Sequence, residues 1–463
     1  MILRIILFIT IIFSQETVGN WQSFSSFHTL KSCKTFNDSE IACLADGGIS
    51  LFNFNDYSSR FITENEGLTK SKYDNFEIDK YKNIWIPSKS DGITIDLWSI
   101  DQAKLLKPFN FNISNIHHLF SDSLNLVGVY QNLDEIGIMH FVFGENNWDY
   151  KDYYLNFGES INEIYDLKIQ GEFIFILTNL GLYKGNIHSN LKNSINWELV
   201  EVINEESYFV EGELLQWHNQ NSIFTKKDET QLVQLELDIS NIKNVIYSDS
   251  IFIITNNEFY IFDSTELIFN YSNSFSSNFI DLNIALDKIY ISIEKHGILE
   301  FSIYNIENPI FFPIPSTILN SEFTAITVLE DDRLVGVGIN GLSFFDGFSW
   351  LNFYPHSSNY EYDPDVFNNF NLNYKLSNGG DGSIFPSWSI VESNPNSLMF
   401  GNTQIIPNNP GYAGALIEYN IETKELAVFD TTNQVLDGFD GIFNSGWNSR
   451  NLLVNQIKVG KNI

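Results

Sequence analysis

Short runs of apolar residues alternate with polar turns along most of this chain. Each unit pairs a run rich in β-branched and aromatic residues with a tight turn at Asn, Asp or Gly and a second such run, which is the pattern of a β-hairpin. The clearest copies are 83–86 with 91–95, 173–177 with 180–183, 289–293 with 296–301, and 334–337 with 340–344, and a weaker first copy is 41–44 with 47–52. The runs lack the 3.6-residue spacing that amphipathic helices require. The pattern therefore predicts an all-β protein built from repeated hairpins.

The hairpins recur at a nearly constant interval. Their turn positions are Gly48, Gly92, Gly137, Gly181, Ser222, Glu258, Gly297 and Gly341, so neighbouring turns lie 36 to 45 residues apart. Two of these copies lack the glycine and are identified by their flanking strands alone. A blade of four antiparallel strands needs roughly 40 to 50 residues, whereas leucine-rich, ankyrin and tetratricopeptide units are shorter. We therefore predict a β-propeller of seven, or alternatively eight, four-stranded blades, followed by the start of a second propeller.

A segment rich in Gly, Pro and Asn interrupts the repeat after the last clear hairpin. We interpret 15–354 as the first propeller, 355–396 as a linker or inserted loop, and 397–463 as a partial second propeller that is cut short. Stretches of this composition and length connect domains or form long loops. The final residues repeat a strand and a turn without the second strand, which would leave an apolar edge unpaired. The alternative is a long loop within one eight-bladed ring that 452–463 closes.

The first fourteen residues, 1–14, have the pattern of a secretory signal peptide. Arg4 gives a short basic start, 5–13 is an uninterrupted apolar run, and Ser14 is a small residue at which cleavage is expected. The alternative is a buried N-terminal strand. No other segment reaches the roughly 18 apolar residues of a membrane-spanning helix. We therefore expect an extracytoplasmic protein, in the periplasm or at the cell surface, without a membrane span.

The chain is strongly acidic. Its 26 Lys and Arg face 58 Asp and Glu, which gives a formal net charge of −32. Nucleic-acid binding needs clustered Lys and Arg that displace the counterions of the phosphates, and the chain has no such cluster. The same charge disfavours adsorption to an anionic membrane surface. We expect no nucleic-acid partner, and we attribute the acid excess to solubility rather than to a dedicated cationic partner.

The two cysteines of the chain are Cys33 and Cys43. They flank the polar stretch 37–40 and would face each other across a hairpin there. In an oxidising compartment such a pair forms a disulfide. The alternative is two free thiols, because unpaired cysteines are commonly buried.

The chain has no recognisable catalytic or metal-binding motif. Its histidines are His28, His117, His118, His140, His188, His218, His296 and His356, and none has the spacing of a zinc site. The acidic cluster of Asp363, Asp365, Asn368 and Asn369 lacks the spacing of a calcium loop. Neither a nucleophile elbow nor a phosphate loop is present. We expect no catalytic residue, no metal, no cofactor and no enzymatic activity, and the sequence assigns no binding residue.

Tryptophans recur beside the predicted strands. They are Trp85, Trp98, Trp148, Trp197, Trp217, Trp350, Trp388 and Trp447. Aromatic faces of this kind can stack on carbohydrate, but they also bury large apolar areas between tilted sheets. We favour the second use, as wedges between blades.

Several of these segments resemble a known family. The segments 21–24, 48–52, 66–69 and 91–96 resemble the N-terminal propeller of PorZ-like proteins, which belong to the type IX secretion apparatus of Bacteroidetes. The segment 341–350 resembles blades of two-component-regulator propellers. The segments 418–420 and 429–433 are similar to the second PorZ propeller. The resemblance covers nearly all of the chain, and it implies two propellers followed by a C-terminal sorting domain.

The resemblance also implies a function. PorZ-like proteins are not enzymes, and they are associated with delivering anionic lipopolysaccharide to the surface sortase that attaches it to secreted cargo. We therefore expect a secreted scaffold or binding module whose partners are surface glycolipid or secretion-system proteins. The first alternative is the extracytoplasmic sensor propeller of a two-component signalling protein. The second is a propeller glycan lyase or hydrolase. No family functional residue carries over to a position of this sequence.

Overall fold

The computed structural model describes residues 25–429 with gaps. The gaps are 57, 70–72, 91, 134, 156, 158–160, 213, 227–231, 238, 276, 315–316, 319–322, 324, 330–332, 339–340, 346–349, 354–373, 376–380, 383–385, 395–396, 406–411, 421–422 and 424–425. The expected signal peptide 1–14, the acidic cluster at 363–369 and the segment 452–463 therefore lie outside the described residues.

The described chain is almost entirely β-structure, and the predicted all-β propeller class is confirmed. It contains nine four-stranded antiparallel sheets, each built from consecutive strands and numbered here 1 to 9 in chain order. Two short 3₁₀ turns, Glu64–Glu66 and Ser194–Asn196, are its helical elements. None of the helical turns in this part of the chain has the length and apolarity that crossing a bilayer requires.

The strands of sheets 1 to 4 come first in the chain. They are β1 (Leu30–Asn37), β2 (Glu40–Ala45), β3 (Gly48–Asn53) and β4 (Ser59–Ile62); β5 (Glu77–Ile78), β6 (Asn83–Ser90), β7 (Gly92–Ser99) and β8 (Lys104–Phe111); β9 (Asn115–Ser121), β10 (Asn125–Asn132), β11 (Glu135–Gly144) and β12 (Asn147–Tyr154); β13 (Ile164–Gln170), β14 (Phe173–Thr178), β15 (Gly181–Asn186) and β16 (Trp197–Glu201).

The strands of sheets 5 to 9 follow. They are β17 (Tyr208–Phe209), β18 (Gln216–His218), β19 (Ser222–Lys226) and β20 (Leu232–Glu236); β21 (Asn244–Tyr247), β22 (Ile251–Ile254), β23 (Glu258–Asp263) and β24 (Glu266–Ser272); β25 (Phe279–Ala285), β26 (Lys288–Ile293), β27 (Gly297–Ser302) and β28 (Asn305–Pro313); β29 (Ala325–Val328), β30 (Leu334–Gly338), β31 (Gly341–Phe345) and β32 (Trp350–Phe353); β35 (Pro386–Asn394), β36 (Ser397–Ile405), β37 (Tyr412–Asn420) and β38 (Leu426–Phe429). A two-stranded hairpin, β33 (Tyr374–Lys375) with β34 (Asp381–Gly382), lies between sheets 8 and 9.

Most of the recurring glycines begin the third strand of their sheets, but Gly137 does not, because it lies inside β11, which begins at Glu135. Gly48, Gly92, Gly181 and Gly297 have φ values of +136°, +122°, +147° and +146°. A Cβ atom at any of these positions would collide with the carbonyl oxygen of a residue at the end of the fourth strand, which is Phe312 in the case of Gly297. Only glycine combines this backbone conformation with so close an approach. The sequence signal therefore has a steric origin.

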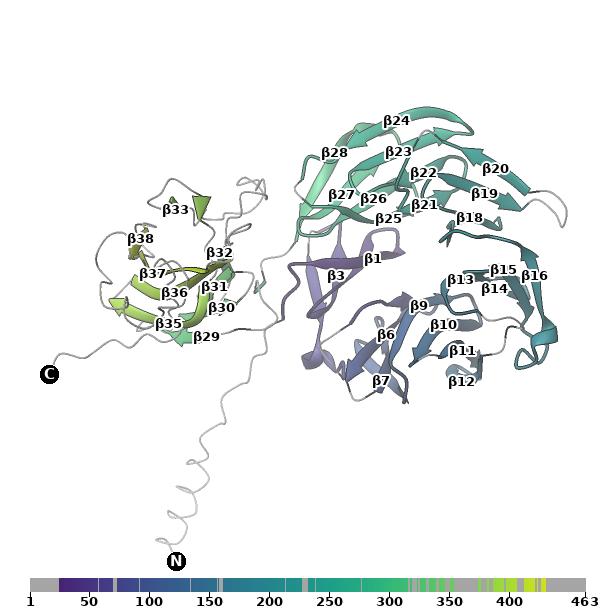
Figure 1. Ribbon diagram of the computed structural model, residues 1–463, viewed down its shortest axis with the longest axis horizontal. Coiled ribbons are helices and arrows are strands. Elements are labelled where there is room, and N and C mark those ends of the chain that lie inside the picture. Colours follow the sequence, from purple (N-terminus) through teal and green to yellow (C-terminus); the bar gives the residue numbers. More distant parts are fainter. Residues whose placement is uncertain are drawn as a thin grey trace, which may run out of the picture.

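Sheets 1 to 7 form a closed ring (Figure 1). Seven clusters of buried apolar side chains lie between neighbouring sheets, one at each junction, and one of them joins sheet 7 to sheet 1. In that closing cluster the rings of Phe54 and Tyr290 stack with their centroids 4.2 Å apart. Trp85, Trp148 and Trp197 lie in the other clusters, with at most 6% of their surface exposed, so they act as wedges between sheets.

The ring closes without strand exchange between the two ends of its sequence. Every sheet consists of four consecutive strands, so no strand of sheet 1 is shared with sheet 7. The innermost strand β1 packs directly against β25, and the backbone N–H of Leu30 donates to the carbonyl of Glu294 at 2.7 Å. Closure therefore depends on side-chain packing and on polar contacts at this one seam.

The domain division differs from the sequence interpretation, which assigned 15–354 to the first propeller. The ring is complete at β28, which ends at Pro313, and β29 and β30 pack against β35. Sheet 8 therefore belongs with sheet 9, and these two sheets form a separate group in Figure 1. The strand β35 also begins at Pro386, inside the segment 355–396 that the sequence pattern predicts to be a linker or an inserted loop. An apparently continuous 44-residue spacing from Gly297 to Gly341 concealed the boundary.

Candidate functional site at the propeller axis

The innermost strand of each sheet has one edge that no further strand covers. Such an edge leaves backbone N–H and C=O groups unpaired. In the ring, side chains from a neighbouring sheet bind these groups, most of them one repeat away in the sequence. Examples are Lys31 Nζ donating to Tyr73 O at 2.7 Å, Asn75 Nδ2 to Ile116 O at 2.9 Å, Lys168 Nζ to Val210 O at 3.1 Å, and Lys243 Nζ to Phe279 O at 2.6 Å. Much of the polar content near the axis therefore holds adjacent sheets together.

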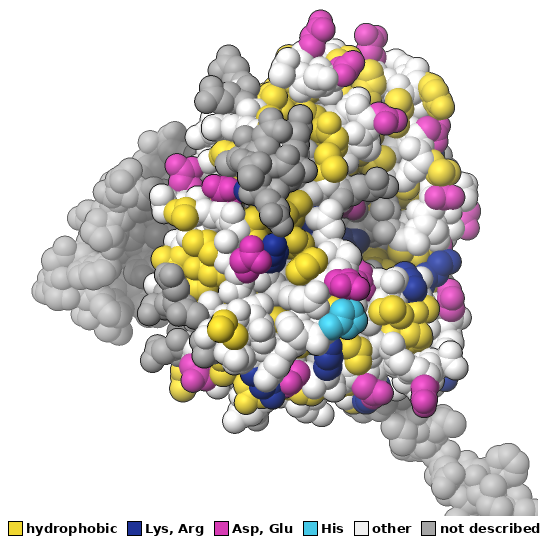
Figure 2. Space-filling model, turned by 90° about the vertical axis from the view of Figure 1, so that its right-hand side faces the viewer, with side chains coloured by type: hydrophobic (Ala, Val, Ile, Leu, Met, Phe, Trp, Pro, Cys, Tyr) yellow, Lys and Arg dark blue, Asp and Glu magenta, His cyan; other side chains and the backbone are white. Residues whose placement is uncertain are grey.

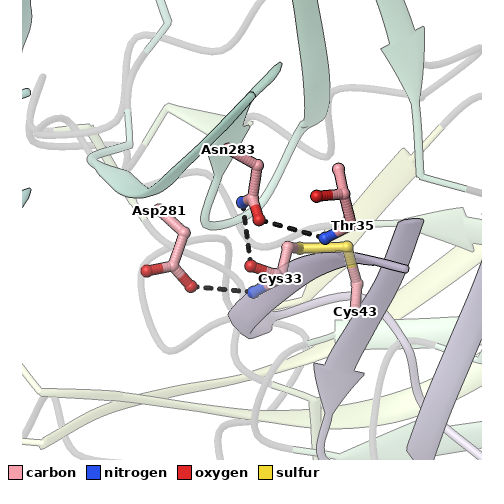
Figure 3. Close-up of a disulfide and its surroundings, with 5 residues drawn as sticks. All are labelled: Cys33, Thr35, Cys43, Asp281 and Asn283. Carbon is pink, nitrogen blue, oxygen red and sulfur yellow. Dashed lines mark hydrogen bonds between the residues drawn. A yellow bond between two sulfur atoms is a disulfide. The ribbon is translucent and has the colours of Figure 1, made fainter. Parts of the chain in front are cut away.

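The seam between sheets 7 and 1 shows this arrangement most fully (Figure 3). Asp281 Oδ2 accepts the backbone N–H of Cys33 at 2.8 Å, and Asn283 Nδ2 donates to the carbonyl of Cys33 at 2.9 Å. Asn283 Oδ1 also accepts the N–H of Thr35 at 3.0 Å. Because the backbone groups of Cys33 are directed to β25, Cys33 and Cys43 form a non-hydrogen-bonded pair between β1 and β2.

Cys33 and Cys43 are joined by a disulfide. Their Cα atoms are 4.1 Å apart, and the two residues lie directly opposite each other in the β1–β2 register. Of the two alternatives that the sequence left open, the structure has the bonded pair. The disulfide lies in the apolar cluster that closes the ring, so it links the first hairpin at the place where the seam depends on β1.

Charged side chains from all seven sheets meet near the axis. We call this group the axial cluster. It consists of Lys34 on β1, Glu77 on β5, His118 on β9, Asp166 and Lys168 on β13, Glu211 just after β17, Lys243 just before β21, and Asp281 on β25. Its members alter one another's pKa values across the ring, as Lys34 does for Glu211 and Asp281. Groups that are far apart in sequence are therefore electrostatic neighbours.

Burial acts on most members of the axial cluster. It lowers the pKa of Lys168, of Lys243 and of His118. Burial also raises the pKa of Asp281, against the opposing effects of the Cys33 N–H and of Lys34. For Lys34, burial is the largest single effect and lowers the pKa, but the hydrogen-bonded Glu77 carboxylate and other acids outweigh it, so the pKa lies above its ordinary value. The cluster is therefore a coupled set of charges in which burial competes with charge–charge attraction, although Lys243 and Glu211 are exposed.

A cavity of about 590 Å³ lies at one end of the axis. Its walls come from the carboxyl ends of four inner strands, and they include Asn37, Glu77, Ser121 and Ile284. Glu77 belongs to both the cavity wall and the axial cluster. A cavity at this position receives contributions from several sheets rather than from one local motif, which is how binding sites on scaffolds of this kind are generally built.

The acidic residues of the cavity wall do not all have the same role. Asp79 Oδ2 accepts the indole N–H of Trp85 at 3.1 Å, and Asp122 Oδ1 accepts the N–H of Leu124 at 2.7 Å, so both carboxylates stabilise turns. Asp38 and Lys80 also line the cavity and have exposed side chains. Together with the partly exposed Lys82, which also lines the cavity, these residues have a charge available to a ligand.

The histidines of the described part of the chain are distributed over several sheets. His140 hydrogen-bonds Tyr154 Oη and Asn125 Oδ1, each at 2.9 Å, inside sheet 3. His117 and His118 are adjacent on β9 and have different environments. His117 is exposed, whereas His118 lies in the axial cluster. No group of three His, Cys, Asp or Glu side chains in the described residues has the arrangement of a metal site.

Sequence reasoning did not identify the axial cluster. The relevant signal was a charged residue within an otherwise apolar first strand, as in Lys34, Asp166 and Asp281, recurring once per repeat. That signal is weak because each residue alone resembles an ordinary polar position of an exposed strand. Only closure of the ring brings residues as distant as Cys33 and Asp281, 248 positions apart, into contact.

The ring and its polar axis define the chain as a β-propeller protein. No protein-family profile and no curated protein matches its sequence. Its structure is similar to that of PorZ, described as an essential bacterial surface component of the type IX secretion system of Porphyromonas gingivalis, with a TM-score of 0.60 and 11% identity. The match covers 89% of this chain and 60% of the PorZ chain, so this chain spans about 60% of the length of that protein. The resemblance to PorZ-like proteins is therefore confirmed in the fold.

Other propellers are similar over a smaller part of the chain. The WD40 repeats of RRP9 match with a TM-score of 0.44 and 12% identity, over 59% of this chain and 92% of theirs. KlAtg21, in a complex with the coiled coil of AgAtg16, matches with a TM-score of 0.46 and 10% identity, over 61% of this chain and 99% of its own. These matches reflect the shared architecture alone.

Proposed function

We propose that this chain is a secreted, non-catalytic binding propeller that serves as an accessory of type IX secretion. The observation that carries the proposal is the extent of the PorZ likeness. The similarity covers 89% of this chain, which exceeds the share of the ring alone and so includes part of the sheets that follow it. A match of that extent supports a common arrangement of ring and following sheets, and it motivates a common role outside the cytoplasm.

The organisation of the axis supports binding rather than catalysis. A general base or nucleophile needs a partner group within hydrogen-bond reach and room for a reacting atom. In the axial cluster, Lys168, Lys243 and Asp281 are instead engaged with backbone groups of neighbouring sheets. The cavity beside the cluster offers mixed polar and apolar walls, which suits the recognition of a partner's surface.

The charge of the molecule favours a protein as the direct partner. Acidic side chains are spread over the face seen in Figure 2, and Lys and Arg are fewer there. With a net charge of −32, the chain would repel an anionic glycolipid at long range and attract a basic protein surface. We therefore assign direct contact to a protein of the secretion apparatus, and glycolipid attachment to the process that the complex serves.

A gene deletion in a bacterium that carries this gene and a type IX apparatus tests the proposal. We expect cargo with a C-terminal sorting signal to be lost from the surface and retained inside the cell, and wild-type gene on a plasmid to restore its export. Unchanged export and unchanged glycolipid attachment after deletion would overturn the proposal. In the same assay, Lys80→Ser in the cavity should restore export poorly, whereas Lys104→Ser on the outer strand β8 should restore it fully.

A further inference from the structure

The seam between sheets 5 and 6 includes a parallel backbone bridge beside the innermost strands. Between sheets 5 and 6 the backbone itself pairs, because Glu211 N–H donates to Val245 O at 3.1 Å and Tyr247 N–H donates to Glu211 O at 2.8 Å. This is a parallel bridge between Glu211 and Ile246. At the neighbouring seams, side chains such as Asp166 and Lys243 bind backbone groups of the adjacent innermost strand. The side chain of Glu211 is therefore not needed to hold its seam.

The carboxylate of Glu211 faces the axial cluster without a hydrogen bond or ion pair to any described residue. Its electrostatic neighbours are Lys34, Glu77, Lys168 and Asp281, which come from four other sheets. By its accessible surface Glu211 is an exposed residue, yet enough protein surrounds its carboxylate that burial is the largest of the effects that raise its pKa. Glu211 therefore lies near the propeller axis, and its carboxylate forms no hydrogen bond or ion pair with a described residue.

The neighbouring charged side chains already form hydrogen bonds or ion pairs. Lys34 pairs with Glu77, Lys168 donates to the carbonyls of Val210 and Gly212, and Asp281 accepts the N–H of Cys33. The axial cluster contains the cations Lys34, Lys168 and Lys243 and the carboxylates Glu77, Asp166, Glu211 and Asp281. His118 is held neutral by burial. Three positive and four negative charges leave one negative charge unbalanced, and Glu211 is the carboxylate without a bond.

We propose that Glu211 receives one cationic side chain, a lysine or an arginine, from a protein partner that inserts along the propeller axis. This inference rests on the proposed function and names the chemistry of the partner. A single ammonium or guanidinium group balances the one excess negative charge and forms a charge-assisted hydrogen bond, which is stronger than one between neutral groups. The net charge of −32 attracts a basic segment before contact.

The ionisation of Glu211 gives the contact a characteristic pH dependence. Burial raises the pKa of Glu211 above its ordinary value, and Glu77 and Asp281 add to the rise while Lys34 and Lys168 oppose it. A bound cation favours the ionised form, so binding should release a proton near the raised pKa and weaken at lower pH. Ordinary surface attraction to a basic peptide lacks this signature, because surface carboxylates are ionised throughout that range.

Titration calorimetry with the full chain and a tetra-arginine peptide tests the inference. We expect binding by the wild type at low salt, and an affinity at least tenfold weaker for Glu211→Gln. The matched control is Glu266→Gln, which removes the same charge from an exposed position on the outermost strand β24 and should leave the affinity unchanged. Equal weakening by both variants, or no binding by the wild type, would overturn the inference. A folding check on Glu211→Gln by thermal unfolding completes the comparison.

The export assay separates this inference from the proposed function. If deletion of the gene blocks export and Glu211→Gln restores it fully, the proposed function stands and the role of Glu211 is rejected. If deletion has no effect on export while the purified chain binds the peptide through Glu211, the proposed function fails and the site remains.

Discussion

Single residues at the axis show which polar groups stabilise the fold and which oppose it. Glu211 has a raised pKa in the folded chain, chiefly because of burial, whereas its ordinary value is 4.5. The folded state therefore binds the proton more readily than the unfolded state does, and stability decreases as pH rises from about 4.5 through the raised pKa. A residue that lowers stability at neutral pH is more easily explained by a function than by folding.

The first prediction follows from this sign. Glu211→Gln should raise the midpoint of thermal unfolding at pH 7, and the difference from the wild type should shrink at pH 4, where the wild-type carboxyl is protonated in both states. Calorimetric scans at the two pH values measure it. A variant that is less stable than the wild type at pH 7 would mean that the carboxylate holds the structure together.

His140 provides the opposite case. Its ring is fully buried, and burial lowers its pKa from 6.5 to about 3. The folded state thus excludes a proton that the unfolded state binds, so stability is complete above pH 6.5 and is lost as pH falls toward 3. His140→Gln should make the decrease in unfolding free energy shallower by up to about 1.4 kcal/mol per pH unit in this window. Urea unfolding at pH 7.5, 6 and 5 measures the slopes, and equal slopes would contradict the role of His140.

Individual strands and turns were the features that the sequence revealed best. The third strands β3, β7, β15 and β27 begin at the glycines that define the repeat, and β19 and β23 begin at Ser222 and Glu258. These two residues replace glycine without difficulty because neither has a positive φ. The steric requirement for glycine is local, so the glycine itself marks these turns in the sequence. By contrast, the contact of Cys33 with Asp281 and the position of Glu211 in the axial cluster depend on ring closure. The residues next to them in the sequence therefore do not predict these features.

A substitution at one of these turns tests the steric argument. Gly297→Val should lower stability by at least about 1 to 3 kcal/mol, because its φ of +146° disfavours any side chain and a Cβ atom would collide with the carbonyl of Phe312. Gly144→Ala is the matched control, since a Cβ atom there meets nothing within 4 Å, and its effect should stay within about 0.5 kcal/mol. Chemical unfolding of both variants decides the point. Equal effects would show that the turn tolerates a side chain.

On the scale of the whole molecule, ring closure determines what can fold independently. Each of sheets 1 to 7 packs against two neighbours, and the last apolar cluster joins β28 and Ile314 to sheet 1. A fragment of residues 25–314 should therefore unfold cooperatively with a β-type circular dichroism spectrum. A fragment of 25–274, which lacks sheet 7, should not, because two sheet faces would be left uncovered. Equal cooperativity of the two fragments would mean that the seam between β1 and β25 contributes little.

The central claim is that the chain binds a protein partner at the axis of its propeller, with contacts from several sheets. An alanine scan of the axial cluster and the cavity wall, read out by restoration of export in the deletion strain, measures this most directly. The residues to include are Asp38 and Lys80 at the cavity and Glu211 in the cluster, each checked for folding, with Lys104 and Glu266 as outer-strand controls. We predict that loss of export maps to at least three different sheets around the axis while the controls stay active. Loss of export confined to one sheet, or equal loss at the outer strands, would contradict the account.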